Sequence, residues 1–168
     1  MRAAIARAKE DHDAAAGEEL LKADFATAAY RAAPGEFEKI VEQLRQRADA
    51  INVQKLVGIP EHRYVAVNHR LEAGKFAIEL EPRVGLDDYS VTVRVGPRPN
   101  VRVFSVGVPP VRTSTWEFQA TVDDQTDFFW LNTKDGTRWS AERIVSEALD
   151  ILSDLELSDR ASKFLRQQ

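Results

Sequence analysis

The feature that most restricts the fold of this chain is a change in the period of its apolar residues. From Tyr64 to Thr133 they recur at every second position, which is the period of a β-strand with one buried face. Six strands are predicted, over residues 63–71, 75–81, 89–95, 101–106, 113–122 and 127–133. The links between them are short and rich in turn residues, which favours antiparallel neighbours. The central part of the chain is therefore expected to form an antiparallel meander.

Apolar residues should face one another across each pair of strands, and this condition predicts a register. The expected pairs are Leu71–Phe76, His69–Ile78, Val67–Leu80, Phe76–Val95, Ile78–Val93, Leu80–Val91, Val95–Val101, Val93–Val103, Val103–Trp116 and Val101–Phe118. One face of the sheet is then apolar through five strands.

Two segments show the spacing of an amphipathic helix. Residues 36–52 carry a continuous apolar stripe, and so do residues 140–157, where Ser140 is the expected N-cap and Glu142 lies in the first turn. These two helices are the natural cover for the apolar face of the sheet. The predicted fold class is α+β, with roughly six antiparallel strands and two helices on one face.

The first 33 residues are rich in alanine, the best helix former, and are predicted to be helical. Gly17 is expected to divide this segment, and Pro34-Gly35 is expected to separate it from the rest. The chain is accordingly divided into an N-terminal helical arm, residues 1–33, and a single α+β domain, residues 34–168.

Composition excludes several classes of function. The chain has no cysteine, which rules out disulfides, thiolate catalysis and Cys-ligated zinc or iron–sulfur centres. Its net charge of −4 argues against a general nucleic-acid binder. No apolar run reaches the length of a membrane helix. The expectation is a bacterial cytoplasmic protein that does not act at a membrane and has no cofactor and no bound metal.

Three arginines in this acidic chain are candidates for contact with an anion. They are Arg94, Arg98 and Arg102. Glu79 and Glu117 are expected to lie beside them on the solvated face of the sheet, so the row can also compensate its own charge. Phe104 is the one clear aromatic that could stack on a nucleic acid there.

Two other motifs suggest chemistry. The DDQTD stretch, residues 123–127, resembles a metal-binding pattern, but it falls in a hairpin loop where aspartates usually bond their own backbone. The register places His69 on the core face near the sheet edge. A histidine there is usually structural, and the alternative is a general base at the rim of a pocket between sheet and helices.

The stretch DFFWLN, residues 127–132, carries four large apolar side chains in a row. A four-residue loop before it turns Phe129 and Leu131 to the core, whereas a five-residue loop turns Phe128 and Trp130 there. Either way two large apolar side chains face outward, and Phe104 shares that face. Three covers are possible: the chain's own residues 1–33, a second copy of the chain, or a heterologous protein or small apolar ligand.

These observations favour a non-catalytic protein-interaction or ligand-binding module, possibly homodimeric, that acts through Phe104 and residues 128–131. The alternative is a small enzyme or ligand carrier with a pocket near His69. No catalytic residue is predicted.

Overall fold

The computed structural model describes residues 2–54, 63–99 and 113–167 of the chain. Its elements, in chain order, are α1 (Arg2–Gln54), β1 (Tyr64–Val67), β2 (Arg70–Ala73), β3 (Phe76–Val84), β4 (Tyr89–Pro97), β5 (Ser114–Val122), β6 (Phe128–Asn132), β7 (Arg138–Trp139) and α2 (Ala141–Arg166). The α+β class is confirmed. The described sheet has seven strands in place of the six expected.

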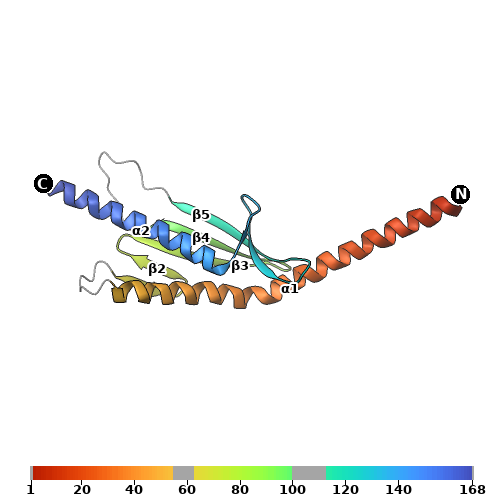
Figure 1. Ribbon diagram of the computed structural model, residues 1–168, viewed down its shortest axis with the longest axis horizontal. Helices are drawn as coiled ribbons and strands as arrows, with labels where there is room; N and C mark the ends of the chain where they lie inside the picture. Colours follow the sequence, from red (N-terminus) through yellow and green to blue (C-terminus); the bar gives the residue numbers. More distant parts are fainter. Residues whose placement is uncertain (1, 55–62, 100–112, 168) are drawn as a thin grey trace.

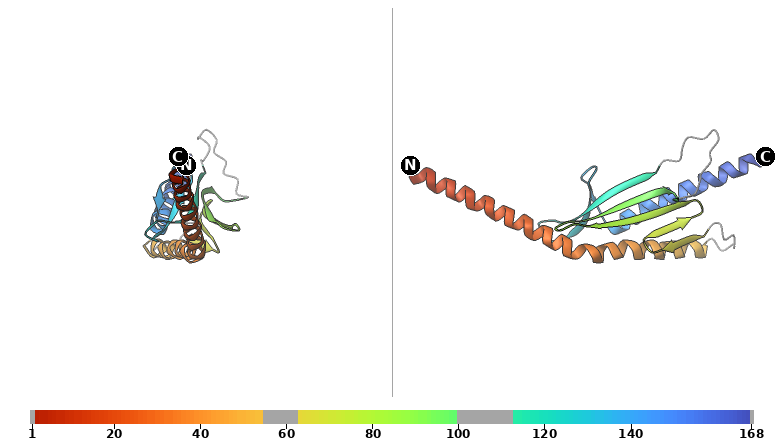
Figure 2. Two further views of the ribbon diagram at one scale, coloured as in Figure 1. Left: turned by 90° about the vertical axis from the view of Figure 1, so that its right-hand side faces the viewer. Right: turned by 180° about the vertical axis from the view of Figure 1, so that it is seen from behind.

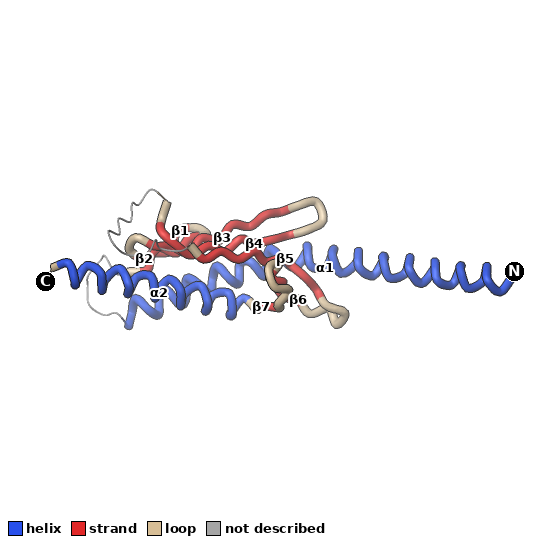
Figure 3. The backbone as a smooth tube through the Cα atoms, turned by 90° about the horizontal axis from the view of Figure 1, so that it is seen from above, coloured by secondary structure: helices blue, strands red, loops and turns tan. Residues whose placement is uncertain are grey.

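All seven strands pair with their neighbours in chain order, and every pair is antiparallel. The predicted meander is therefore confirmed. The second half of α1 and most of α2 lie along one face of this sheet, and the two termini lie at opposite ends of an elongated molecule (Figure 1). Seen from above, the sheet and the two helices form two adjacent layers (Figure 3).

The inner face of the sheet forms the core together with the two helices. From the sheet it contains Leu71, Phe76, Ile78, Leu80, Tyr89, Val91, Val93, Val95, Phe118 and Trp130, and from the helices Ala33, Phe37, Ile40, Leu44, Ile144, Val145 and Leu152. Full burial of one such side chain stabilises the fold by about 1.5–3 kcal/mol. The predicted helical cover over the apolar face is thus confirmed.

The predicted segment 63–71 is not one strand. It divides at a turn formed by Asn68 and His69, so β1 and β2 make their own hairpin. Asn68 has a φ of +52°, in the left-handed region that asparagine tolerates better than most residues. The alternating apolar pattern runs through this turn, which is why periodicity alone did not reveal it. His69 therefore lies in a turn at the sheet edge, and its ring faces the helical layer, where it contacts the buried Phe37.

The register between β3 and β4 differs from the expectation by two residues. Ile78 pairs with Val95 and Leu80 with Val93, because β3 continues to Val84 and leaves a four-residue loop. The backbone N–H of Gly85 donates to the carbonyl of Asp88 and closes that loop at 2.9 Å. A shift of two residues keeps every side chain on its expected face, so the composition of the core is unchanged.

Strand β4 pairs directly with β5. Val91 lies opposite Phe118 and Val93 opposite Trp116, so the expected pairs of Trp116 and Phe118 with Val103 and Val101 are wrong. Residues 101–106, the strand predicted between them, lie outside the described residues. Residues 91–95 and residues 101–103 both have valines at alternate positions. Matching apolar residues across strands therefore could not tell which of the two segments would lie beside β5.

Helix α1 is continuous over 53 residues and contains both predicted breaks, Gly17 and Pro34. It bends in the stretch around Pro34, as two views of the molecule show (Figures 1 and 2). A proline inside a helix removes one hydrogen bond and its ring displaces the preceding turn. Ala29 and Phe37 are buried on either side of Pro34, so packing carries the helix across the proline. The expected boundary between residues 33 and 34 falls inside this helix.

Both ends of the helical layer are fixed by side chains. The Asn52 amide bonds both backbone groups of Tyr64, donating to its carbonyl and accepting from its N–H, each at 2.8 Å. This pair of bonds ties the end of α1 to β1. Ser140 caps α2 as predicted, accepting from the N–H of Arg143 at 3.1 Å, with Glu142 in the first turn. Helix α2 continues beyond residue 157 to Arg166.

Candidate functional site

The loop before the DFFWLN strand has five residues, 123–127, which is the second of the two predicted alternatives. Ala120 pairs with Trp130 and Val122 with Phe128, so Trp130 points into the core and is 1% exposed. The Phe128 ring meets the Trp130 ring edge-on, 5.1 Å between centroids. Phe129 therefore faces outward with its neighbour Leu131, and both are half-buried.

The outward pair is partly covered by the chain itself. The guanidinium of Arg138, on β7, lies 4.3 Å from the centre of the Phe129 ring. The same guanidinium bonds the carboxylate of Asp123 at 3.0 Å, which holds it over the ring. Residues 2–24 do not serve as the cover, because this part of α1 runs away from the sheet (Figure 1). The expectation that residues 1–33 fold across the outer face is wrong for this part.

The DDQTD loop is stabilised from within. Asp123 accepts from the backbone N–H of Asp127 at 2.9 Å and of Gln125 at 3.0 Å. These backbone bonds, that of Asp127 first, lower the pKa of Asp123 below its usual value, with a further contribution from Arg138. The predicted aspartate turn is therefore confirmed for Asp123.

The arginines of the solvated face have carboxylate partners. Arg94 lies opposite Glu79 in the register and 3.8 Å from its carboxylate, and Arg70 bonds the same carboxylate at 3.2 Å. Arg98 bonds Glu72 at 3.1 Å. The remaining candidates, Arg102 and Phe104, lie outside the described residues. Arg70, Glu79 and Arg94 lie opposite one another across β2, β3 and β4, and the residue opposite Arg94 on β5 is Thr115, while Glu117 lies opposite Thr92.

His69 is exposed, and its ring packs edge-on against Phe37 of α1 at 5.0 Å. The cavity that described residues line beside it measures about 10 Å³. That is close to the space of one water molecule and far below the roughly 300 Å³ of a small ligand site. A pocket for chemistry at His69 thus has no support in this part of the structure.

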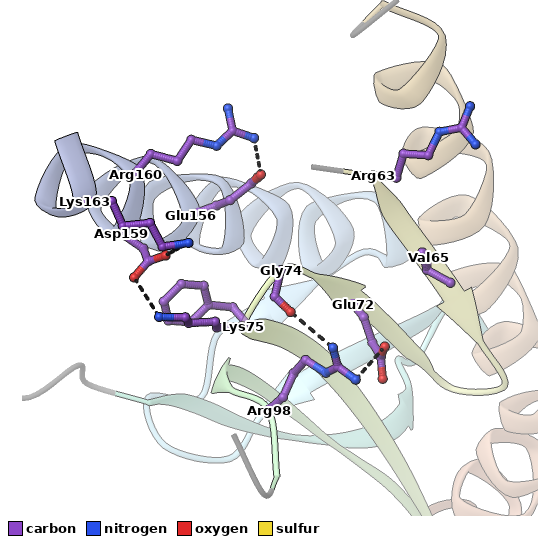
Figure 4. A pocket seen from close by; sticks show the side chains of 11 residues that line it. Arg63, Val65, Glu72, Gly74, Lys75, Arg98, Glu156, Asp159, Arg160 and Lys163 are labelled. Atoms are coloured by element: carbon purple, nitrogen blue, oxygen red, sulfur yellow. Dashed lines mark hydrogen bonds and ion pairs between the residues drawn. The ribbon is translucent and has the colours of Figure 1, made fainter. Parts of the chain in front are cut away.

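The structure forms a different concavity, which was not among the predicted sites. It lies between the β2–β3 turn, the start of β1 and the second half of α2, and its volume is about 420 Å³ (Figure 4). Its lining residues are Arg63, Val65, Glu72, Gly74, Lys75, Phe76, Arg98, Glu156, Asp159, Arg160 and Lys163. We call this concavity the charged hollow. Five of its side chains are cationic and three are carboxylates, a net charge of +2.

Ion pairs organise the wall formed by α2. Asp159 lies between two lysines, 3.7 Å from Lys75 and 3.4 Å from Lys163. Arg160 bonds Glu156, one helical turn before it. The two i,i+4 pairs on α2 fix the direction of these side chains along the rim (Figure 4).

Hydrogen bonds join Arg98 to the wall formed by the β2–β3 turn. Gly74 has a φ of +59°, a conformation that glycine adopts without steric cost. The Arg98 guanidinium donates to the Gly74 carbonyl at 3.2 Å, and the backbone N–H of Arg98 donates to the carbonyl of Lys75 at 2.8 Å. With the Glu72 pair, these bonds connect Arg98 to both β2 and the turn that follows it.

A buried carboxylate lies at the base of the α2 wall. Glu156 is only 6% exposed, and Tyr64 beside it is 4% exposed. Burial of the phenol, followed by the nearby charge of Glu156, raises the pKa of Tyr64 to about 12. Arg160 neutralises the Glu156 carboxylate, so that pair contributes no net charge to the hollow.

Residues 2–24 of α1 form a second feature, which we call the projection. Residues 4–24 are exposed apart from Gly17, and Phe25 is the first apolar side chain that packs on the core. At 1.5 Å per residue the projection extends about 35 Å from the body. Its large apolar side chains are Ile5, Leu20 and Leu21, which are 64%, 68% and 56% exposed.

The sequence contained a weak signal for the hollow. Glu156–Arg160 and Asp159–Lys163 are oppositely charged pairs at i,i+4, which is the spacing that continues a helix past residue 157. Nothing in the sequence showed that the Gly74–Lys75 turn would meet this helix. That contact depends on the sheet twist and on the long separation along the chain.

Within residues 2–54, 63–99 and 113–167, no three His, Asp or Glu side chains gather as a metal site would require. No helix in the same ranges has the length and apolar character needed to cross a membrane. Comparisons with protein-family models, with curated proteins and with solved structures gave no match. The projection and the charged hollow are the two surface features of the described residues that could contact a partner or a ligand.

Proposed function

We propose that the protein is a non-catalytic interaction module that forms a homodimer through its projection. The observation that supports this is a solvent-exposed helix of about 35 Å with large apolar side chains and nothing of the described chain against it. Fully burying one leucine or isoleucine stabilises by about 1.5–3 kcal/mol, so a partner helix that covers them gains affinity.

Ile5 and Leu20 lie on the same side of the projection. They are separated by 15 residues, slightly more than four helical turns, so their directions differ by only about 60°. Leu21 lies about 100° further round the helix. Ala16, between the first two, is small enough to let a second helix approach closely.

An antiparallel arrangement of two copies matches this pattern. When the pair is centred between His12 and Asp13, Ile5 of each chain comes level with Leu20 of the other. The bodies of the two copies then lie at opposite ends of the paired helices, because each projection points away from its own body (Figure 2). A twofold axis uses the same patch on both chains.

The charge distribution along the projection also favours the antiparallel direction. Residues 2–9 carry a charge of +3, and residues 10–19 carry −5. Antiparallel pairing brings Arg7 of one chain level with Glu18 and Glu19 of the other. Parallel pairing would place every acidic residue beside its own copy, which is unfavourable at interhelical distances of about 8–10 Å.

Sedimentation equilibrium of the full chain over a range of concentrations tests the proposal. We expect Leu20→Glu to weaken the dimer by about tenfold or more, since it places a charge in the apolar contact on both chains. Leu21→Glu is the matched control, with the same chemistry one position away and on another side of the helix, and should leave association unchanged. Both positions are exposed, so circular dichroism should show intact folds. A chain that stays monomeric at all concentrations, or equal effects of both substitutions, would refute the proposal.

A further inference from the structure

The projection carries a lysine on the side that Ile5 and Leu20 define. Lys9 follows Ile5 by four residues and precedes Leu20 by eleven, so its direction is about 40° from the first and about 20° from the second. A single lysine in the contact between paired helices lowers their affinity but specifies their arrangement. Lys9 is therefore placed where it can select the way in which a second helix pairs.

Lys9 is exposed, and among the described residues of its own chain it has no ion pair. Asp13 lies four residues further along the same helix, but the base comes before the acid, which is the less favourable order. In the opposite order and at the same spacing, Lys22 bonds Glu18 at 2.9 Å. The ammonium of Lys9 is thus free to pair with a carboxylate of another chain.

Antiparallel pairing centred between His12 and Asp13 supplies such a carboxylate. Lys9 then comes level with Ala16 of the second copy, which is small enough to leave room for the lysine stem. Asp13 of the second copy lies three residues from that alanine, about 4.5 Å along the axis. Its direction is about 20° beyond that of Leu20, and a twofold axis keeps it on the same side of the contact as Lys9. The pairing therefore creates two Lys9–Asp13 contacts between the chains.

The parallel arrangement reverses the sign of these contacts. Lys9 of one chain would lie beside Lys9 of the other, and Asp13 beside Asp13, so all four charges would meet their like. Like charges at the distance between paired helices repel one another. The same two residues thus favour one direction of pairing and oppose the other.

We infer that Lys9 is the residue that determines the direction of the dimer, by pairing with Asp13 of the other chain. This inference rests on the proposed dimer and names the contact that selects its antiparallel form. An apolar residue at position 9 would give a tighter contact but would not distinguish the two directions.

Charge reversal tests the contact, with sedimentation equilibrium of the full chain as the measurement. Lys9→Glu and Asp13→Lys should each weaken the dimer by about tenfold, because each turns two attractive contacts into repulsive ones. The variant with both substitutions restores opposite charges between the chains and should return to within about threefold of the wild-type affinity. Asp11→Lys is the matched control for Asp13→Lys, since it makes the same change of charge on the far side of the helix, and it should leave the dimer unchanged.

A disulfide reports the direction itself. The chain has no cysteine, so Ala16→Cys introduces its only thiol. In the antiparallel pair the two thiol positions are seven residues apart, about 10.5 Å along the axis, which is too far for a disulfide, whereas in a parallel pair they lie side by side. Ala16→Cys should therefore stay unlinked under mild oxidation. Ala16→Cys combined with Lys9→Leu should form linked dimers, because two leucines then meet in the parallel pair where two lysines had repelled.

The possible outcomes separate this inference from the proposed function. Lys9, Asp11, Asp13 and Ala16 are all exposed, so circular dichroism should show an intact helix in every variant. A wild-type chain that stays monomeric, or a linked dimer of Ala16→Cys alone, would overturn both proposals. A dimer that Leu20→Glu disrupts and Lys9→Glu does not, or a double variant as weak as the sum of its two single changes, would overturn the role of Lys9 alone.

Discussion

Replacing Pro34 by alanine should stabilise the protein, because Pro34 lies inside the continuous helix α1. Proline in a helix interior is about 3 kcal/mol less favourable than alanine, since it lacks an N–H and its ring crowds the preceding turn. Alanine at this position can donate to the carbonyl of Tyr30 and so adds one helical hydrogen bond. Alanine also gives the unfolded chain more freedom, which offsets about 0.4–1 kcal/mol of the gain. The expected increase in unfolding free energy is therefore about 2 kcal/mol.

Urea denaturation followed by tryptophan fluorescence measures this change, since Trp116, Trp130 and Trp139 all lie in the sheet. Gly35→Ala is a useful control. A Cβ at Gly35 meets no atom within 4 Å. Alanine there should raise the unfolding free energy by up to about 1 kcal/mol, whether residue 35 lies in the middle of a helix or near its start. Small-angle scattering should also show a longer molecule for Pro34→Ala, because the bend is relaxed.

An unfolding free energy that is unchanged or lower in Pro34→Ala would contradict this prediction. If residues 34–54 formed a separate helix that starts at Pro34, proline would occupy the first-turn position that it favours. Pro34→Ala would then leave stability unchanged or lower it, while Gly35→Ala would still raise it. That outcome would mean that the projection is a separate helix and not an extension of the body.

Four further predictions concern the body. Asn52→Ala should lower the unfolding free energy by about 1–3 kcal/mol in urea titrations, because two backbone groups of Tyr64 lose their partner. Ser140→Ala should cost about 1 kcal/mol and Ser140→Asp almost nothing, which a comparison of unfolding midpoints would show. Trp130→Ser should cost more than about 3 kcal/mol and reduce soluble yield, since this side chain is buried in the core. Burial raises the pKa of Tyr64 from an ordinary value near 10 to about 12, so the unfolded chain loses this proton at a lower pH than the folded chain does. The unfolding free energy should therefore fall between pH 10 and pH 12 in urea titrations, and this fall should be absent in Tyr64→Phe.

The sequence predicted the parts of the fold that depend on side-chain period. Ile78, Leu80 and Val93 were correctly predicted to lie on the buried face. Their cross-strand partners differ from the prediction by two residues, and a shift of two keeps each side chain on the same face. The cap at Ser140 was correct because it depends on a few neighbouring residues. In each case the relevant interaction is local or repeats along the chain.

The errors arose where a tertiary interaction overrides local preference. Pro34 predicts a helix boundary, but the buried residues Ala29 and Phe37 hold the helix together across it. The turn at Asn68 is hidden because apolar residues continue at alternate positions through it. The charged pairs on the α2 wall of the hollow could be expected from their i,i+4 spacing, but the hollow itself could not, since Lys75 and Asp159 are brought together only when α2 packs across the sheet.

The order of the elements has a consequence for the nascent chain. Each strand of the meander can pair as soon as it follows its neighbour from the ribosome, so the sheet can assemble during synthesis. The apolar side of β3 and β4 must wait longer, because α2, which packs against both, is translated after all seven described strands. Until then an apolar surface is exposed to other chains, and a message truncated before Ala141 would yield a sheet that keeps that surface uncovered. We expect such fragments to aggregate or to be captured by chaperones.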